Sequence, residues 1–296
     1  MTPGSAAARS FILLQRLLPQ HGLSRLIHAL ARVRQRAVKN ALIRAFVRGF
    51  NPDLSDAKQP DPLAYETFNA FFTRELTPNA RPLPQDPLAI ASPVDGTISQ
   101  IGYLDDEAIV QAKGRTYSLG ALLAGASAEI EEFAGGAFAT LYLAPYDYHR
   151  IHMPWSGRLR TTRHVPGELF SVNAVTAAGV DRLFARNERV VCVWDDARQP
   201  FAMALVGALF VGSISTVWHG EITPPTRRTA RELPPVSGPG AQLAAGDLMG
   251  WFNMGSTVIL LFPKGRVRWL ADLTAGMSVR VGEALGQLRS LDLPAP

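Results

Sequence analysis

The chain has 296 residues, of which 47% are hydrophobic and 19% are charged, a composition typical of a globular protein with a sizeable core. The single cysteine, Cys192, excludes an internal disulfide framework and any cysteine-rich metal site, and no run of 18 apolar residues predicts a membrane-spanning helix. The net charge of +5 is uneven, because the first 50 residues carry nine Lys or Arg and no acidic residue, whereas the remaining 246 carry −4.

The first 50 residues have the apolar spacing of amphipathic helices. Pro19 and Gly22 predict a break between a short helix over residues 10–18 and a longer second helix. The second helix carries apolar residues at spacings of three and four, namely Leu23, Leu26, Ile27, Leu30, Val38, Leu42 and Phe46. Its polar face is almost entirely arginine, which favours binding to an anionic membrane surface.

Three other interpretations of this basic segment stay open on the sequence alone. An arginine-rich, acid-free N-terminus also resembles an organelle transit peptide. It is basic enough to bind nucleic acid, although no interleaved aromatic residues support that function. Finally, the helices would have a purely structural role if they packed on the rest of the protein.

A connector and one short helix follow. Residues 51–64 are polar and contain proline, as is typical of a linker. Residues 65–76 predict a short amphipathic helix, and residues 77–87 predict a proline-rich loop.

From about residue 88 the chain consists of short β-like runs separated by Gly and Pro. The runs cover residues 96–104, 107–112, 138–144, 189–194, 201–215 and 256–262. In this part only residues 118–125 predict a helix, and residues 223–240 predict a long surface loop. The expected fold class is therefore α+β, with an antiparallel β-rich core over residues 61–296 and amphipathic helices within residues 1–60.

A flexible triplet, Gly255-Ser256-Thr257, interrupts the apolar run "FNMGSTVILLF" of residues 252–262. A glycine inside a strand often marks only a bulge, and threonine is a good strand residue. Taken alone, the triplet therefore favours a structural bend.

Two further polar patches lie in apolar surroundings. Asp95-Gly96 is typical of a tight hairpin turn. His149 and His152 lie three residues apart in "YHRIHMP", but no cysteine and no obvious acidic partner accompanies them; the pair alone is weak evidence for metal binding, and we expect no metal site. An Asp, a His and a Ser on separate segments could also form the hydrogen-bonded catalytic triad of a serine hydrolase, although a G-x-S-x-G elbow is absent.

Six motifs together identify the family that the chain resembles. In order along the chain they are "FFTREL", "SPVDGTI", "YHRIHMP", "PGELFSVN", "LFARNERVV" and "FNMGSTVILLF". They resemble the phosphatidylserine decarboxylases, from about residue 60 to the C-terminus and more loosely through the basic N-terminal helices. One departure is Met254, where the family usually has leucine, a change that nearly conserves volume.

The resemblance implies that the protein cuts itself between Gly255 and Ser256, into a β chain of residues 1–255 and an α chain of residues 256–296. Gly255 offers an accessible carbonyl and a backbone free to adopt strained conformations, and Ser256 provides the attacking hydroxyl. The family pattern assigns His152 as the base, oriented by Asp95. Elimination from the resulting ester and hydrolysis of the imine then leave a pyruvoyl group at Ser256.

The same resemblance implies the second reaction. Decarboxylation needs an electron sink that no standard side chain supplies. A Schiff base between the pyruvoyl group and the amine of phosphatidylserine would serve, giving phosphatidylethanolamine and carbon dioxide, with His149 as the proton donor. The implied enzyme is a pyruvoyl-dependent carboxy-lyase whose catalytic domain covers residues 61–296.

The expected partners are phosphatidylserine, an anionic lipid surface and the paired α and β chains, with no nucleic acid; further dimerisation stays open. We expect a peripheral membrane protein on the cytoplasmic face of the cell membrane. Two alternatives are a serine hydrolase that uses Ser256, His152 and Asp95, and a non-enzymatic β module tethered to membranes.

Overall fold

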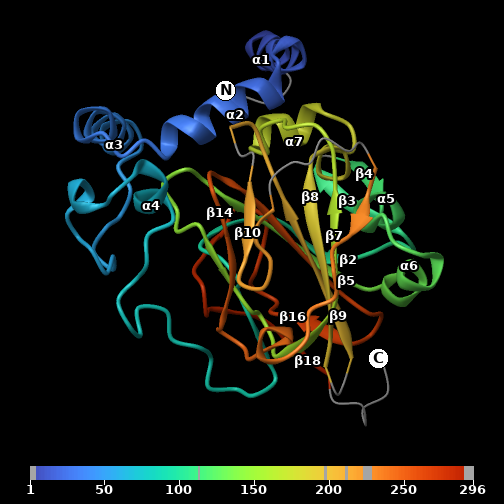
Figure 1. The fold of residues 1–296 in the computed structure, drawn as a ribbon. Helices are drawn as coiled ribbons and strands as arrows, with labels where there is room; N and C mark the ends of the chain where they lie inside the picture. The colour runs from blue at the N-terminus through green and yellow to red at the C-terminus, as the bar shows by residue number, and fades with distance from the viewer. Residues whose placement is uncertain (1–4, 113, 197–198, 211–212, 223–228, 290–296) are drawn as a thin grey trace.

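The computed structural model describes residues 5–112, 114–196, 199–210, 213–222 and 229–289 (Figure 1). Three helices lie at one end of the molecule, α1 (Ala6–Leu17), α2 (Gln20–Ala31) and α3 (Arg36–Phe50). The expected second helix is therefore two helices. Continuing the spacing of four from Leu30 places Arg34 where an apolar residue would be needed, and the chain leaves the helical conformation there.

A short helical region follows α3. It contains the 3₁₀ turn η1 (Pro62–Ala64) and α4 (Phe68–Phe72). The side chain of Thr67 accepts a hydrogen bond from the backbone N–H of Ala70 and thereby caps α4. The predicted helix over residues 65–76 is thus confirmed in place but is shorter than expected.

The core is a large antiparallel sheet of nine strands within the described residues. Its order is β12, β7, β8, β9, β15, β5, β2 and β17, with β13 paired to β7. The bounds are β2 (Gly96–Tyr103), β5 (Ala137–Leu143), β7 (Gly157–Val165), β8 (Arg189–Asp195), β9 (Pro200–Val206), β12 (Arg231–Glu232), β13 (Gln242–Leu243), β15 (Ser256–Phe262) and β17 (Ser278–Val279).

Three smaller antiparallel sheets complete the β structure. One has the order β11 (Gly220–Ile222), β10 (Ile214–Thr216), β14 (Leu248–Phe252) and β6 (Arg150–His152). Another has the order β1 (Ala89–Ala91), β18 (Ala284–Leu288) and β16 (Val267–Trp269). The third pairs β3 (Ala108–Ala112) with β4 (Arg115–Ser118). The expected α+β class with an antiparallel β-rich core is confirmed.

The expectation of one helix after residue 88 is wrong. Besides α5 (Leu119–Leu123), the structure has α6 (Ser127–Phe133), α7 (Ala174–Gly179), α8 (Leu183–Arg186) and the 3₁₀ turn η2 (Pro239–Ala241). These helices have four to seven residues, too few for a helical repeat to be visible in the sequence. Of the predicted loop over residues 223–240, residues 223–228 lie outside the described residues.

Strand β15 lies in the centre of the large sheet, between β5 and β9. Val258, Leu260 and Phe262 face one hydrophobic core. Ile259 and Leu261 face a second core, which the helices after residue 118 cover. Both faces of the strand are therefore buried, which explains its continuous apolar sequence.

A third apolar cluster joins the N-terminal helices to the body of the protein. It contains Ile43 and Phe46 of α3 together with Phe68, Phe71 and Phe72 of α4, and Met254 packs against it. Within the described residues no helix is both long and apolar enough to span a membrane.

Candidate active site

The segment around the Gly255-Ser256 bond crosses from one sheet to another. It leaves the four-stranded sheet at Phe252, the end of β14, and enters the large sheet at Ser256, the first residue of β15. Between them Met254 has a φ angle of 147°, which residues other than glycine rarely adopt. The backbone strain expected at Gly255 therefore lies at Met254, immediately before the bond.

Three buried polar atoms beside this bond lack a hydrogen-bond partner among the described residues. They are Ser256 Oγ, Thr257 Oγ1 and His149 Nε2. The side chains of Ser256 and His149 are fully buried. A Cβ built on Gly255 would lie 3.7 Å from His149 Nε2, so this nitrogen lies close to Gly255. Unsatisfied buried polar groups are costly, and such a cluster is a strong indication of a reactive site.

His149 is held in the form of a neutral base. Its Nδ1–H donates to the carbonyl of Asp147 over 2.8 Å, which leaves a lone pair on Nε2. The ring packs against Phe72, with the ring centroids 4.1 Å apart. Burial lowers the pKa of His149 to about 3, so the imidazole is neutral at physiological pH.

His152 has other contacts. Its Nδ1–H donates to the carbonyl of Gly246 over 2.8 Å, and its Nε2 accepts from the Tyr148 hydroxyl over 3.1 Å. Burial lowers the pKa of His152, although the Gly246 carbonyl opposes this shift. The side chain lines a cavity of about 580 Å³, together with Arg81, Tyr148 and Arg150.

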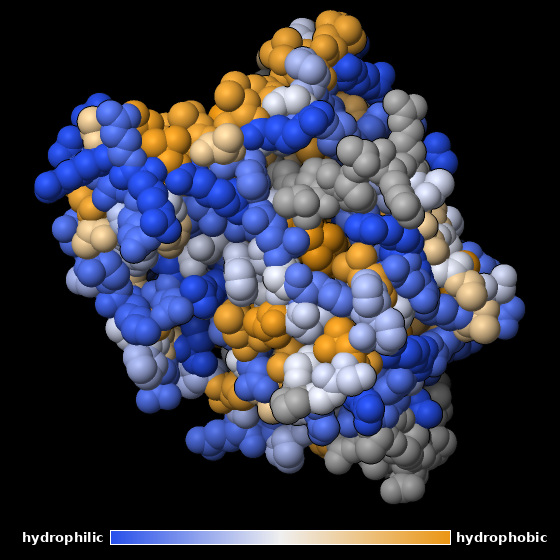
Figure 2. Space-filling model, in the orientation of Figure 1, coloured by the Kyte–Doolittle hydropathy of each residue, from blue (hydrophilic) through white to orange (hydrophobic). Residues whose placement is uncertain are grey.

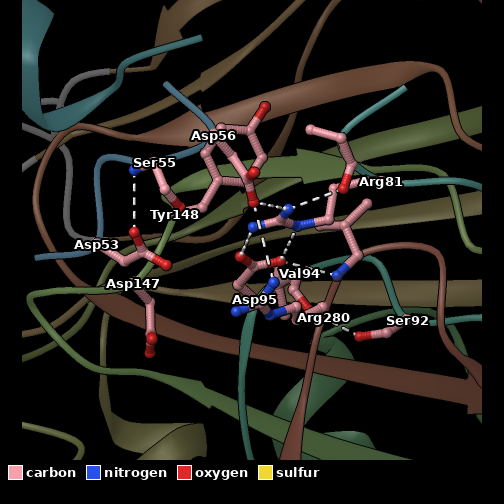
Figure 3. A network of polar contacts seen from close by, with 12 residues as sticks. Asp53, Ser55, Asp56, Arg81, Ser92, Val94, Asp95, Asp147, Tyr148 and Arg280 are labelled. Carbon is pink, nitrogen blue, oxygen red and sulfur yellow. Dashed lines mark hydrogen bonds and ion pairs between the residues drawn. The ribbon is translucent and has the colours of Figure 1, made fainter. Parts of the chain in front are cut away.

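Asp95 accepts several hydrogen bonds in the polar network that Figure 3 shows. Its carboxylate accepts from Arg81 Nε over 3.0 Å, from Arg81 Nη2 over 2.7 Å and from the N–H of Val281 over 2.8 Å. Arg81 also donates to Asp56 over 2.8 Å, and these bonds raise the pKa of Arg81. Asp95-Gly96 is not a hairpin turn, because β1 pairs with β18 whereas β2 pairs with β5 and β17.

The predicted site residues thus form two groups. Gly255, Ser256 and His149 lie together, whereas Asp95 and His152 each make their described hydrogen bonds to other residues. The sequence did not indicate Arg81, which occurs in a proline-rich loop. The only available signal was an arginine in an otherwise uncharged stretch of that loop.

Among the residues that the structure describes, no group of three His, Cys, Asp or Glu side chains is arranged to hold a metal ion.

Comparisons with known proteins give one consistent result. The family model described as phosphatidylserine decarboxylase matches residues 68–287, and a model described as PSD matches residues 10–51. A protein of Methylococcus capsulatus named phosphatidylserine decarboxylase proenzyme is 52% identical over 279 residues, covering 94% of this chain and 96% of the relative. Proteins with the same name from Azotobacter vinelandii and Chromobacterium violaceum are 50% and 51% identical, each covering 94% of this chain and 98% of the relative.

Proposed function

Since the chain belongs to the phosphatidylserine decarboxylase family, we propose that it is a proenzyme that cuts itself between Gly255 and Ser256. The mature enzyme then converts phosphatidylserine to phosphatidylethanolamine and carbon dioxide. The observation that carries the proposal is the cluster of Ser256 Oγ and His149 Nε2, both buried and unpartnered among the described residues, at a strained crossing between two sheets.

Self-cleavage begins with attack of Ser256 Oγ on the Gly255 carbonyl carbon. A base takes the hydroxyl proton, the peptide C–N bond breaks, and an ester joins the two residues. Loss of the Ser256 Cα proton then expels the Gly255 carboxylate and leaves dehydroalanine. Its imine form adds water and loses ammonia, which yields the pyruvoyl ketone at the new N-terminus.

The geometry favours His149 as the base for the first step. It is neutral, its free lone pair is on Nε2, and that atom faces Gly255. In the family pattern, Asp95 binds His152 and His152 binds Ser256. His152 instead binds the Gly246 carbonyl and the Tyr148 hydroxyl, and Asp95 binds Arg81. We therefore propose His149 for the first proton transfer and keep the pair of His152 and Asp95 as the alternative.

The residues around Ser256 fit a pyruvoyl group formed in place. Gly255 has no side chain to fill the space beside His149 Nε2, and the apolar strands β5 and β9 flank Ser256 on both sides. The ketone supplies an acceptor for the electron pair that departing carbon dioxide leaves behind. Phe72 and the Asp147 carbonyl hold the His149 ring close to Gly255, where it can deliver a proton next to Ser256.

We propose that α1 and α2 lie on the surface of the membrane, on its cytoplasmic face, without crossing it. Leu13, Leu14 and Leu17 of α1 are 57%, 55% and 75% exposed, and Leu26 of α2 is 62% exposed. Figure 2 shows the resulting apolar band along the upper edge of the molecule. Phe46, in contrast, packs in the cluster of α3 and α4 and is not available to lipid.

Polar residues attach these helices to the body of the protein. The Gln15 side chain accepts from the N–H of Ser171 over 2.8 Å, and that of Gln20 accepts from the N–H of Leu169 over 2.7 Å. An amphipathic helix that turns its amides inward and its leucines outward is arranged for contact with lipid.

Intact-mass measurement of denatured protein tests the proposed function. We expect two chains, residues 1–255 and 256–296, with the smaller one blocked at its N-terminus by the pyruvoyl group. A serine hydrolase and a non-enzymatic membrane module would each give one uncut chain. Release of carbon dioxide from phosphatidylserine vesicles tests the second reaction.

The role of each histidine is tested with the variants His149→Ala, His152→Ala and Asp95→Asn. If His149 is the base, its removal slows self-cleavage by about 10²–10⁴-fold, and the other two variants are still cut. If His152 and Asp95 provide the base, their variants remain uncut, whereas His149→Ala is cut but does not release carbon dioxide.

A further inference from the structure

Asn253 anchors the crossing segment two residues before Gly255. Its Nδ2 donates to the hydroxyls of Ser213 and Ser215, each over 2.9 Å, and its backbone N–H donates to the Ser213 carbonyl over 3.1 Å. Its Oδ1 accepts from Asn69 Nδ2 of α4 over 3.1 Å. The side chain is 95% buried, so these bonds are shielded from water.

The same network continues to helix α2. The Ser213 hydroxyl that accepts from Asn253 donates its own proton to the carboxylate of Glu221 on β11. That carboxylate also accepts from His28 Nε2 over 2.7 Å and from Arg32 Nη2 over 2.6 Å. One unbroken chain of hydrogen bonds therefore joins α2 to the residue that precedes strained Met254.

We propose that Asn253 is a positioning residue for self-cleavage, and that the contact of α2 with Glu221 sets its position through Ser213. This inference rests on the proposed cleavage at Gly255-Ser256. Asn253 fixes where the backbone leaves β14, and β15 fixes where Ser256 begins, so Met254 and Gly255 are stretched between two anchors. The site is thus completed only when α2 is seated on the body of the protein.

The effect on rate follows from the geometry of nucleophilic attack. A displacement of about 1 Å in a reacting group costs on the order of 100-fold in rate. Ser213 carries the link, because its hydroxyl both accepts from Asn253 and donates to Glu221. Glu221 is the accessible point of the link, since its side chain is 34% exposed and its replacement leaves the core intact.

The first experiment follows conversion of newly synthesised chain into two chains in cell-free translation. We expect Ser213→Ala and Asn253→Ala to be cut about 10- to 100-fold more slowly, and Ser213→Thr, which keeps the hydroxyl, to be cut within threefold of the unaltered chain. Glu232→Ala is the matched control, because it removes an exposed acid that pairs with an arginine away from this network. Ser213→Ala cut at the unaltered rate would overturn the proposal.

The second experiment is a double-mutant cycle on surface residues, which does not depend on tolerance of the core variants. Glu221→Ala and the pair His28→Ala/Arg32→Ala should each slow cleavage about tenfold, and their combination should slow it no further. Independent, multiplying effects, or no effect of Glu221→Ala, would refute the link to α2. An unaltered chain that is never cut would instead refute the proposed function.

Discussion

The residues beside the Gly255-Ser256 bond differ from those of an ordinary buried turn in what they leave unsatisfied. Ser256 and His149 each bury a polar atom that has no partner among the described residues. Such atoms reduce stability, and the structure tolerates them next to a backbone that Met254 already strains. These features lower the free energy of unfolding, as is expected at a site where the chain must react with itself.

Replacing Ser256 by alanine tests the nucleophile. Ser256→Ala should fold, remain one chain and release no carbon dioxide, because the variant lacks both the attacking oxygen and the atoms of the pyruvoyl group. The measurement is intact mass together with a decarboxylation assay. Two chains from this variant would rule out Ser256 as the nucleophile.

Acid should destabilise the uncut protein through His149. The folded-state pKa of about 3 lies below the ordinary value of 6.5, so the unfolded chain binds more protons between these values. The His149 contribution to stability is therefore lost as the pH falls from about 6.5 toward 3, by about 1.4 kcal/mol for each pH unit.

Comparing Ser256→Ala with Ser256→Ala/His149→Gln isolates this contribution. Burial raises the pKa of Asp147 to about 6, which acts in the opposite direction over part of the range and is common to both proteins. Denaturant unfolding from pH 7 to 4 should show the larger loss in the single variant. Parallel curves would show that His149 titrates normally in the folded state.

At the scale of elements, the sequence predicts what is periodic and what is carried by chemically distinctive residues. The apolar run of β15 and the motifs containing His149 and Ser256 could be identified, because each is local. The pairing of Asp95 with Arg81 and the strain at Met254 could not be predicted, since each depends on segments that only the tertiary fold brings together. The short helices α6, α7 and α8 were missed because tertiary packing stabilises them more than any repeat of their own.

Two glycines at strand ends should respond differently to alanine. A Cβ on Gly96 would lie 2.4 Å from the Tyr142 carbonyl oxygen, so β2 and β5 would have to separate. A Cβ on Gly255 would have His149 Nε2 as its nearest atom, at 3.7 Å, which is an ordinary van der Waals contact.

We therefore expect Gly96→Ala to reduce the free energy of unfolding by about 3 kcal/mol. Gly255→Ala should change it by about 1 kcal/mol or less. Both changes are measured by denaturant unfolding in the Ser256→Ala background. Equal losses would show that the close approach of β2 to β5 is not a stabilising constraint.

For the molecule as a whole, the three N-terminal helices differ in a way that the sequence alone did not reveal. α1 and α2 expose leucines, whereas α3 contributes Ile43 and Phe46 to the cluster that contacts Met254. Packing of the segment on the body of the protein is thus confirmed, through polar contacts for α1 and α2 and through apolar contacts for α3. Deleting residues 1–59 would remove part of the core and is a poor test of membrane binding.

A sharper test replaces the exposed leucines of α1 by serine. Leu13→Ser/Leu14→Ser/Leu17→Ser should weaken binding to anionic vesicles about 100-fold, at about 1 kcal/mol for each leucine that partly enters the acyl region. Self-cleavage should be unchanged. The remaining arginine attraction should disappear at high salt, because exposed charges are screened.

The matched control replaces three exposed apolar residues on other elements, as Tyr103→Ser/Val110→Ser/Met277→Ser. Co-sedimentation with vesicles at low and high salt compares the two proteins. Equal binding by both would place the membrane contact elsewhere on the molecule.

The position of β15 limits the lifetime of each molecule. In the proposed cleavage, the reactive group stands at the first residue of the strand that β5 and β9 enclose. The short chain that carries it cannot leave without disrupting the middle of the sheet. A damaged pyruvoyl group therefore cannot be replaced by one from solution. Each enzyme molecule keeps the group that it formed, and lost activity is restored only by synthesis of a new chain.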